Sequence, residues 1–328
     1  MTISIWRYSH LVLAIASSLF LLVASVTGVI LAVEPIAHQA KGYSVGNLDE
    51  ISFATVIDGL KQNYDEVFSL EVESSDFVKA SVLTEDFETQ DIYINPITGE
   101  KIGEVAKRSE IYSFATNLHR SLFLKSIGRF FVGLVSLLLF LIAVTGIWLL
   151  AKRQGGFRKF FSKVQKEYFE MRYHVIFSRL FFIPIIIVAL TGVYLSAEKF
   201  ELLPNASVEI QDNSTSEESQ NFENLSDIPF FKETKLSELR KLDFPFSEDP
   251  DDFFHIALKD KEIQVNQFTG TIEASAQYPF VVLASRLSLV LHTGEGSVWW
   301  SIVLLIASAS IVFFICLSFC FPISFFVF

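Results

Sequence analysis

Cysteine, glycine and charged residues are all scarce in this sequence, and each scarcity excludes a class of protein. The two cysteines, Cys316 and Cys320, lie in one apolar C-terminal run, so no disulfide framework or cysteine metal site is expected. Fifteen glycines in 328 residues exclude a collagen-like chain, and 51% hydrophobic residues exclude a disordered one. No glycine-rich nucleotide fingerprint is present, so a nicotinamide-binding site is not expected.

Apolar residues, by contrast, are abundant: phenylalanine alone occurs 34 times, and the mean hydropathy is +0.42. A helix that crosses a membrane needs about 20 consecutive apolar residues. Four stretches approach or exceed that length: Leu11–Val33, Phe130–Ala151, Leu180–Ala197 and Val298–Phe328. We therefore predict an α-helical membrane protein with four transmembrane helices. The last stretch is longer than a bilayer requires and no cation follows Glu295, which suggests a truncated or frameshifted end.

The charges between these stretches predict the orientation of the chain. Residues 151–179 contain eight lysines and arginines against two acidic residues. Residues 34–119 contain six against 16, and residues 200–290 contain seven against 17. Short basic loops remain in the cytoplasm, whereas long loops are translocated regardless of charge. We therefore expect both termini and the short loop inside, and both long loops outside.

These boundaries divide the chain into seven expected segments. They are a first helix with a short cytoplasmic start (1–37), a first outer domain (38–118), a second helix (119–151), a basic cytoplasmic loop (152–173), a third helix (174–199), a second, diverged outer domain (200–290) and a fourth helix (291–328). In the first outer domain, Ser52–Asn63 has the periodicity of an amphipathic helix. Alternating runs predict strands at Val67–Val72, Phe77–Leu83, Asp91–Asn95, His255–Leu258 and Glu262–Asn266. Each outer domain is thus expected to be small and α+β, and the polar stretch Asn205–Asn221 is expected to be flexible.

The chain also repeats itself at a spacing of 164 residues. The matched residues are His10 with His174, Thr27-Gly28-Val29 with Thr191-Gly192-Val193, and Glu34 with Glu198. Leu118-His119 and Leu291-His292 match in order at the outer ends of the second and fourth spans. Because each copy starts inside, we expect two parallel repeats about an axis along the membrane normal, with equivalent positions face to face at equal depth.

This axis pairs the histidines that stand at the entrances of the four spans. His10 and His174 are expected to meet near the inner surface, and His119 and His292 near the outer surface. Two imidazoles that converge at one depth can hold a haem iron between them, and ionisable groups at membrane borders are costly and usually functional. The simpler interpretation, an interfacial histidine that bonds a nearby carbonyl, stays open for each of the four.

The neighbouring candidates have competing interpretations. The Thr-Gly pairs at 27, 145 and 191 either make room for a haem or simply let helices pack closely, and helix packing is favoured. His38, about 42 Å along a helix from His10, either replaces an outer ligand or is an exposed residue, the second being favoured. His255 is expected to be structural. Zinc is the weaker metal because each depth offers two imidazoles and no nearby cysteine or carboxylate set.

At these residues the chain resembles the PepSY-associated transmembrane family of bacterial inner-membrane proteins, which includes siderophore-iron reductases. The resemblance covers nearly the whole chain. Its carriers are Trp6-Arg7-Tyr8-Ser9-His10, Asn117-Leu118-His119-Arg120, Arg172-Tyr173-His174, Leu291-His292-Thr293-Gly294 and the strand and turn Asp91–Gly103. The resemblance implies PepSY-like outer domains and two b-type haems whose iron is bound by His10, His119, His174 and His292.

The function that this resemblance implies is electron transfer across a bacterial inner membrane. The donor would be a cytoplasmic flavoprotein or other reductant, and the acceptor a ferric-siderophore or other iron-bearing molecule outside. Such a chain is an oxidoreductase component without catalytic residues of its own, surrounded by lipid and with no nucleic-acid partner. Two haems at different depths divide one long electron transfer into shorter ones. The alternative is a membrane-anchored binding or regulatory scaffold without redox activity; a transporter is disfavoured because no span has a charge at mid-depth.

Overall fold

The computed structural model describes residues 5–163, 169–204, 211–212, 222 and 224–320, which divide into two compact units. The first, called here the helical bundle, is built from residues 1–38, 108–204 and 284–328. The second, called here the sheet unit, is built from residues 39–107 and 205–283. Most of the polar stretch 205–221 and the last eight residues, 321–328, lie outside the described residues.

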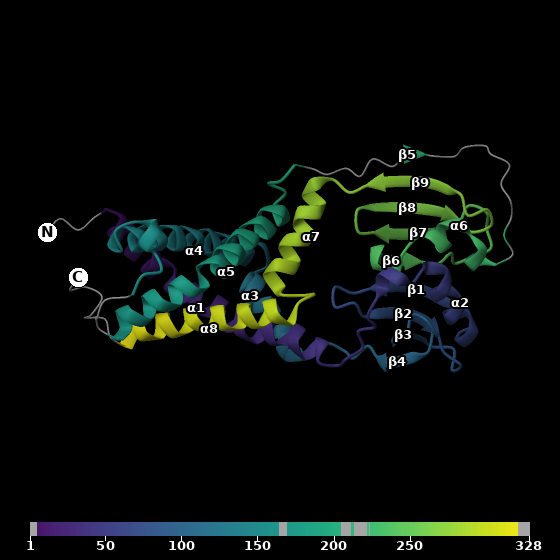
Figure 1. The fold of residues 1–328 in the computed structure, drawn as a ribbon, viewed down its shortest axis with the longest axis horizontal. Coiled ribbons are helices and arrows are strands. Elements are labelled where there is room, and N and C mark those ends of the chain that lie inside the picture. Colours follow the sequence, from purple (N-terminus) through teal and green to yellow (C-terminus); the bar gives the residue numbers. More distant parts are fainter. Residues whose placement is uncertain (1–4, 164–168, 205–210, 213–221, 223, 321–328) are drawn as a thin grey trace. The chain divides into compact units, whose positions relative to one another are not determined.

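Four helices of the described bundle are long and apolar enough to cross a membrane, and Figure 1 shows them side by side. They are α1 (Ile5–Gln39), α4 (Lys125–Arg153), α5 (Phe169–Lys199) and α8 (Val298–Cys320). Each contains one of the predicted apolar stretches, so the prediction of a multi-pass helical membrane protein is confirmed. At 1.5 Å per residue α1 is about 52 Å long, so it extends well beyond an apolar bilayer core of about 30 Å.

Two shorter helices precede two of the spans and were not predicted as separate elements. They are α3 (Glu110–Ser121), before α4, and α7 (Phe280–Thr293), before α8. Each ends at a residue in the left-handed conformation, Leu122 with φ 49° and Gly294 with φ 84°. The chain can therefore turn between each short helix and the span that follows it. His119 and His292, expected at the start of the spans, lie instead in the last turns of α3 and α7.

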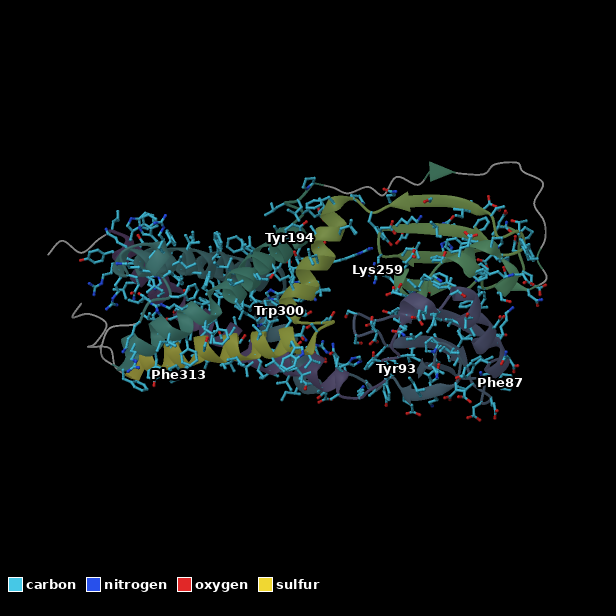
Figure 2. The ribbon with its side chains drawn as sticks, in the orientation of Figure 1. Phe87, Tyr93, Tyr194, Lys259, Trp300 and Phe313 are labelled. Carbon is cyan, nitrogen blue, oxygen red and sulfur yellow. The ribbon has the colours of Figure 1, made fainter. Side chains whose placement is uncertain are left out.

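The turn between α7 and α8 depends on glycine and on two side chains of α8. A Cβ at position 294 would lie 2.6 Å from the Ser301 Oγ atom, so only glycine fits there. The Ser301 hydroxyl donates a hydrogen bond to the Gly294 carbonyl at 2.8 Å. Trp300, labelled in Figure 2, donates its indole N–H to the Leu291 carbonyl at 2.8 Å. These contacts fix the end of α7 immediately beside His292.

In the sheet unit, the described strands form one antiparallel sheet with the order β4-β3-β2-β1-β6-β7-β8-β9-β5. The first long loop provides β1 (Val67–Val72), β2 (Val78–Leu83), β3 (Thr89–Ile94) and β4 (Lys101–Glu104). The second provides β5 (Gln211–Asp212), β6 (Leu239–Asp243), β7 (Phe253–Leu258), β8 (Lys261–Asn266) and β9 (Ile272–Gln277). All five predicted strands are present, with bounds within two residues.

The two long loops, expected as two small domains, share this sheet and its core. β1 pairs with β6, so that Leu70 lies opposite Leu242. One face of the sheet is covered by α2 (Phe53–Asn63) from the first loop and α6 (Pro229–Glu233) from the second. A domain of about 60 residues buries too little surface to be very stable alone, and a shared core relieves that weakness. The predicted amphipathic helix at Ser52–Asn63 is present as α2, and the Ser52 side chain caps it by accepting a hydrogen bond from the Thr55 N–H.

Candidate functional site

The structure brings His119 of α3 and His292 of α7 together. The centroids of their rings are 6.1 Å apart, and the ring planes are inclined by 61°. Both residues are half-buried. The two histidines predicted to meet at the outer end of the bundle are therefore adjacent.

His10 of α1 and His174 of α5 form the second pair. They are close enough for the charge of His10 to act on His174. The His174 ring also packs against the ring of Phe314 on α8, with centroids 4.8 Å apart at an angle of 74°. Phe313, the neighbour of Phe314, is labelled on α8 in Figure 2. The sequence predicted this pair as well, from the 164-residue register.

The two pairs lie at different levels of the bundle. His10 precedes Thr27 on α1 by 17 residues, and His174 precedes Thr191 on α5 by the same number. Thr27 contacts His119 and Thr191 contacts His292. At 1.5 Å of rise per residue, the levels of the two pairs are separated by about 25 Å along these helices. That separation is close to the thickness of the apolar core of a bilayer.

Three of the four histidines bond a threonine of another helix, which the sequence reasoning missed. The Nδ1 atom lies 2.8 Å from the threonine Oγ1 in the pair His119–Thr27, 2.9 Å in His10–Thr145 and 3.0 Å in His292–Thr191. These are the threonines of the three Thr-Gly pairs that the sequence singled out. The signal was present in the motif, but it could not be used without knowing which helices are neighbours.

The glycines of the Thr-Gly pairs leave space for the rings and for close helix packing. A Cβ at Gly146 would lie 3.2 Å from the His10 Cε1 atom, and a Cβ at Gly192 would lie 3.3 Å from the His292 Cε1 atom. A Cβ at Gly192 would also lie 2.7 Å from the Ser136 Oγ atom on α4. The favoured interpretation of these pairs as small-residue packing positions therefore fits the glycines, whereas the threonines bind imidazole.

Two glutamates hold the helices that carry the outer histidines. The Arg108 side chain, just before α3, donates hydrogen bonds to both carboxylate oxygens of Glu34 on α1, at 2.6 and 2.5 Å. On α7, the Ser285 hydroxyl donates to the carboxylate of Glu198 on α5. Glu34 and Glu198 are the residues that the sequence repeat matches. Equivalent acidic side chains thus tie α3 to α1 and α7 to α5.

The remaining two histidines lie elsewhere. His38 is in the last turn of α1, 28 residues along that helix from His10. His255 is on β7 in the sheet unit, where it is exposed and its Nδ1 atom lies 3.4 Å from the Gln264 Nε2 atom. Among the described residues, no group of three histidine, cysteine or acidic side chains could hold a metal ion.

The sheet unit carries an open cavity of about 350 Å³, lined by both polar and apolar side chains. Its polar lining includes Lys241, Asp243, His255, Glu262 and Gln264. Elsewhere in the sheet unit, Tyr93 donates its hydroxyl to Glu73, and the pKa of Tyr93 is raised by burial and by the charge of Glu73. These side chains make the sheet unit a second candidate binding surface.

Comparison with known proteins agrees with the resemblance carried by the motifs. A family model described as the PepSY-associated TM region matches residues 7–321, and no curated protein matches the chain. The matched range includes all four membrane helices, both histidine pairs and every strand of the sheet. The chain therefore belongs to the family of the PepSY-associated TM region.

Proposed function

We propose that the protein is a transmembrane electron carrier with two b-type haems, one between His119 and His292 and one between His10 and His174. The observation that carries this proposal is the geometry of the outer pair, whose ring centroids are 6.1 Å apart. Two imidazoles that bind one metal ion from opposite sides, each through a bond of about 2 Å, have ring centres roughly 6 Å apart. The separation of the two rings in the outer pair therefore suits a shared iron.

The chemistry of the donors also suits haem iron. Each pair offers two imidazoles, which would hold the iron of one haem. The recorded hydrogen bonds of His10, His119 and His292 use Nδ1 and leave Nε2 to bind a ligand. When bound, the haems would supply one-electron chemistry. The chain itself would hold the imidazoles, surround them with apolar helices and set the distance between the two levels.

The charge of the loops supports a direction for the electrons. The loop between α4 and α5 is basic and would attract an acidic cytoplasmic flavoprotein or other reductant. The two long loops together contain 33 acidic residues, as 16 and 17, against 13 basic ones, as 6 and 7. On average this field repels a free ferric-siderophore anion, so a neutral or cationic iron complex, or one delivered by a partner protein, is the favoured acceptor.

The test is the absorbance spectrum of the purified protein, followed by reconstitution in liposomes. We expect a b-type haem spectrum with two haems per chain. After reduction from the side of the basic loop, the haems should be reoxidised by a membrane-impermeant ferric chelate on the side of the long loops. Protein that never binds haem would overturn the proposal. Haem that is reduced but never reoxidised, whatever the charge of the chelate, would contradict the reductase role and leave a haem-binding scaffold.

A second candidate is a membrane-anchored binding or regulatory scaffold, which the open cavity of the sheet unit favours. Its lining mixes charged side chains and a histidine with apolar residues such as Ile256 and Ile263. The same preparation distinguishes the two candidates. A scaffold needs no haem, whereas the electron carrier cannot act without it.

A further inference from the structure

We infer that Thr27, Thr145 and Thr191 are positioning residues that hold His119, His10 and His292 in one tautomer, with Nδ1 protonated and Nε2 presented for ligand binding. The inference about the tautomer stands on hydrogen bonds of this chain alone. Its consequence for a bound iron rests on the proposed function.

The first step is that each Nδ1 atom faces acceptors. The Nδ1 atom of His292 lies 3.0 Å from the Thr191 Oγ1 atom and 3.2 Å from the Val188 carbonyl oxygen. A carbonyl oxygen can only accept, so the ring nitrogen that bonds it must carry the proton. The imidazole of His292 is therefore in the Nδ1–H form.

The same arrangement occurs at the other two histidines. Nδ1 of His10 bonds Thr145 and Nδ1 of His119 bonds Thr27, and the backbone of Ile142 lies close to the first ring and that of Ala24 to the second. In all three cases that backbone residue is the third before the threonine. Inside a helix the N–H groups are used by the preceding turn, so the carbonyl is the group that faces the ring. Three sites built from different helices thus repeat one local geometry.

The threonine hydroxyls reinforce this tautomer. Each has a single proton, which it donates to carbonyls three and four residues earlier in its own helix. The shorter contacts are those to the fourth residue: Val23 at 2.8 Å, Leu141 at 2.8 Å and Ile187 at 2.7 Å. The lone pairs of the hydroxyl oxygen are then left to accept a bond from the imidazole. The threonine oxygen and the carbonyl oxygen together offer two acceptors to one imidazole N–H. A neutral imidazole bound in this way has its lone pair at Nε2.

The adjacent glycine explains why the motif is Thr-Gly rather than threonine alone. The Cε1 atom, which would contact a Cβ at Gly146 or Gly192, lies between the two ring nitrogens. A side chain at the glycine would therefore push the ring edge next to the ligating nitrogen. Threonine binds one nitrogen, and glycine leaves the ring free to aim the other.

The threonine and the carbonyl would act on a bound iron through the imidazole. A hydrogen bond at the far nitrogen fixes the ring orientation and raises the basicity of the ligating nitrogen, and loss of such a partner typically costs about 10–100-fold in metal affinity. A more basic ligand stabilises ferric over ferrous iron, so its loss should raise the reduction potential.

The first experiment uses the haem-free, full-length protein with ¹⁵N-labelled histidine in lipid nanodiscs. NMR chemical shifts distinguish the two neutral tautomers. We expect His10, His119 and His292 in the Nδ1–H form, assigned by comparison with the single His→Ala variants. Nε2–H signals for these three would overturn the inference. This measurement decides the tautomer even if the protein binds no haem, so it fails or succeeds independently of the proposed function.

The second experiment titrates haem into the Thr27→Val and Thr27→Ser variants and measures the potential of the outer haem. Valine keeps the shape and loses the hydroxyl, so affinity should fall about 10–100-fold and the potential should rise. Serine keeps the hydroxyl and should restore both. Ser17→Ala is the matched control, because Ser17 is buried on the same helix and donates to the Leu13 carbonyl at 2.7 Å. Thr27→Val protein with wild-type affinity and potential would overturn the role of the threonine.

Discussion

The helical bundle buries polar as well as apolar side chains, whereas the sheet unit buries almost only apolar ones. Of the described polar or charged residues that are buried, all except Thr234 lie in the bundle, and they include Thr27, Thr145 and Thr191. On the outer surface of the spans, Leu19 is 65% exposed. In the sheet unit, Phe53, Val56 and Leu70 are fully enclosed in one apolar core.

The surroundings of the two units explain this difference. Lipid tails are as apolar as leucine, so burying apolar side chains between spans gains little, and small or polar residues occupy the helix interfaces instead. In the sheet unit apolar burial against water is the main source of stability. A buried threonine in the bundle therefore marks a contact with a partner such as an imidazole. A buried phenylalanine in the sheet unit marks the core.

The largest expected difference between the two units is in how histidine replacement changes the haem content. His119→Ala or His292→Ala should remove the outer haem, and His10→Ala or His174→Ala the inner one, because an iron left with one protein ligand is weakly held. Haem content per chain, measured by absorbance, checks this, with His255→Ala of the sheet unit as the control that keeps both haems. Full haem content in all four variants would contradict the ligand assignment. Loss of the outer haem only when His38 is also replaced would identify His38 as a substitute ligand.

Replacement of a core residue in the sheet unit should affect the stability of that unit rather than the haem content of the bundle. Phe254 is 1% exposed and packs edge-on against Phe231, with centroids 5.1 Å apart, so Phe254→Ala should destabilise the sheet unit by about 3–5 kcal/mol. Hydrogen exchange of the β7 and β8 amides measures the loss. The four tryptophans, at positions 6, 148, 299 and 300, all lie in the bundle and report on it separately. Unchanged exchange in β7 and β8 would mean that the shared core does not hold the sheet together.

Two glycine replacements should distinguish the site of His10 from the site of His119 within the bundle. In Gly146→Ala the new methyl group lies 3.2 Å from the His10 Cε1 atom, whereas in Gly28→Ala it lies 3.8 Å from the His119 Cε1 atom. At Gly28 the tight contact, at 3.2 Å, is with the Ser308 Oγ atom rather than with the ring. Gly146→Ala should therefore weaken the inner haem more than Gly28→Ala weakens the outer one. A redox titration that resolves the two haems measures both. Equal effects would show that the glycines act only in helix packing.

The smallest effect is expected in a turn of the sheet unit. Hydrogen bonds from the backbone N–H groups of Ser247 and Phe246 lower the pKa of Asp252. The charged carboxylate is the form that holds the turn, so its contribution is present at neutral pH and is lost as the pH falls through the lowered pKa. Amide exchange at Ser247 should therefore stay slow below the ordinary aspartate pKa of about 3.9. In Asp252→Asn this pH dependence should disappear; its persistence would assign the effect to another group.

Local pattern accounts for most of the elements predicted correctly. The spans, α2 and β1 follow from apolar runs and from periods of 3.6 and 2, which depend only on neighbouring residues. β6, with the sequence Leu-Arg-Lys-Leu-Asp, was missed because only its pairing with β1 and β7 makes it a strand. The short helices α3 and α7 were merged with the spans because their ends depend on left-handed turns, which hydropathy does not reveal.

The sequence by itself determined that the chain has four stretches long and apolar enough to cross a membrane, and that histidines and Thr-Gly pairs recur in a fixed order. Hydropathy and residue spacing are properties of the linear chain and do not depend on tertiary contacts. Only the tertiary structure decided that β1 and β6 join the two long loops in one sheet. It also decided that the threonine of each Thr-Gly pair hydrogen-bonds a histidine 92, 101 or 135 residues away. The physical reason is that hydrogen bonds over such separations are set by which helices pack together, and packing depends on the shapes of whole helix surfaces rather than on local pattern.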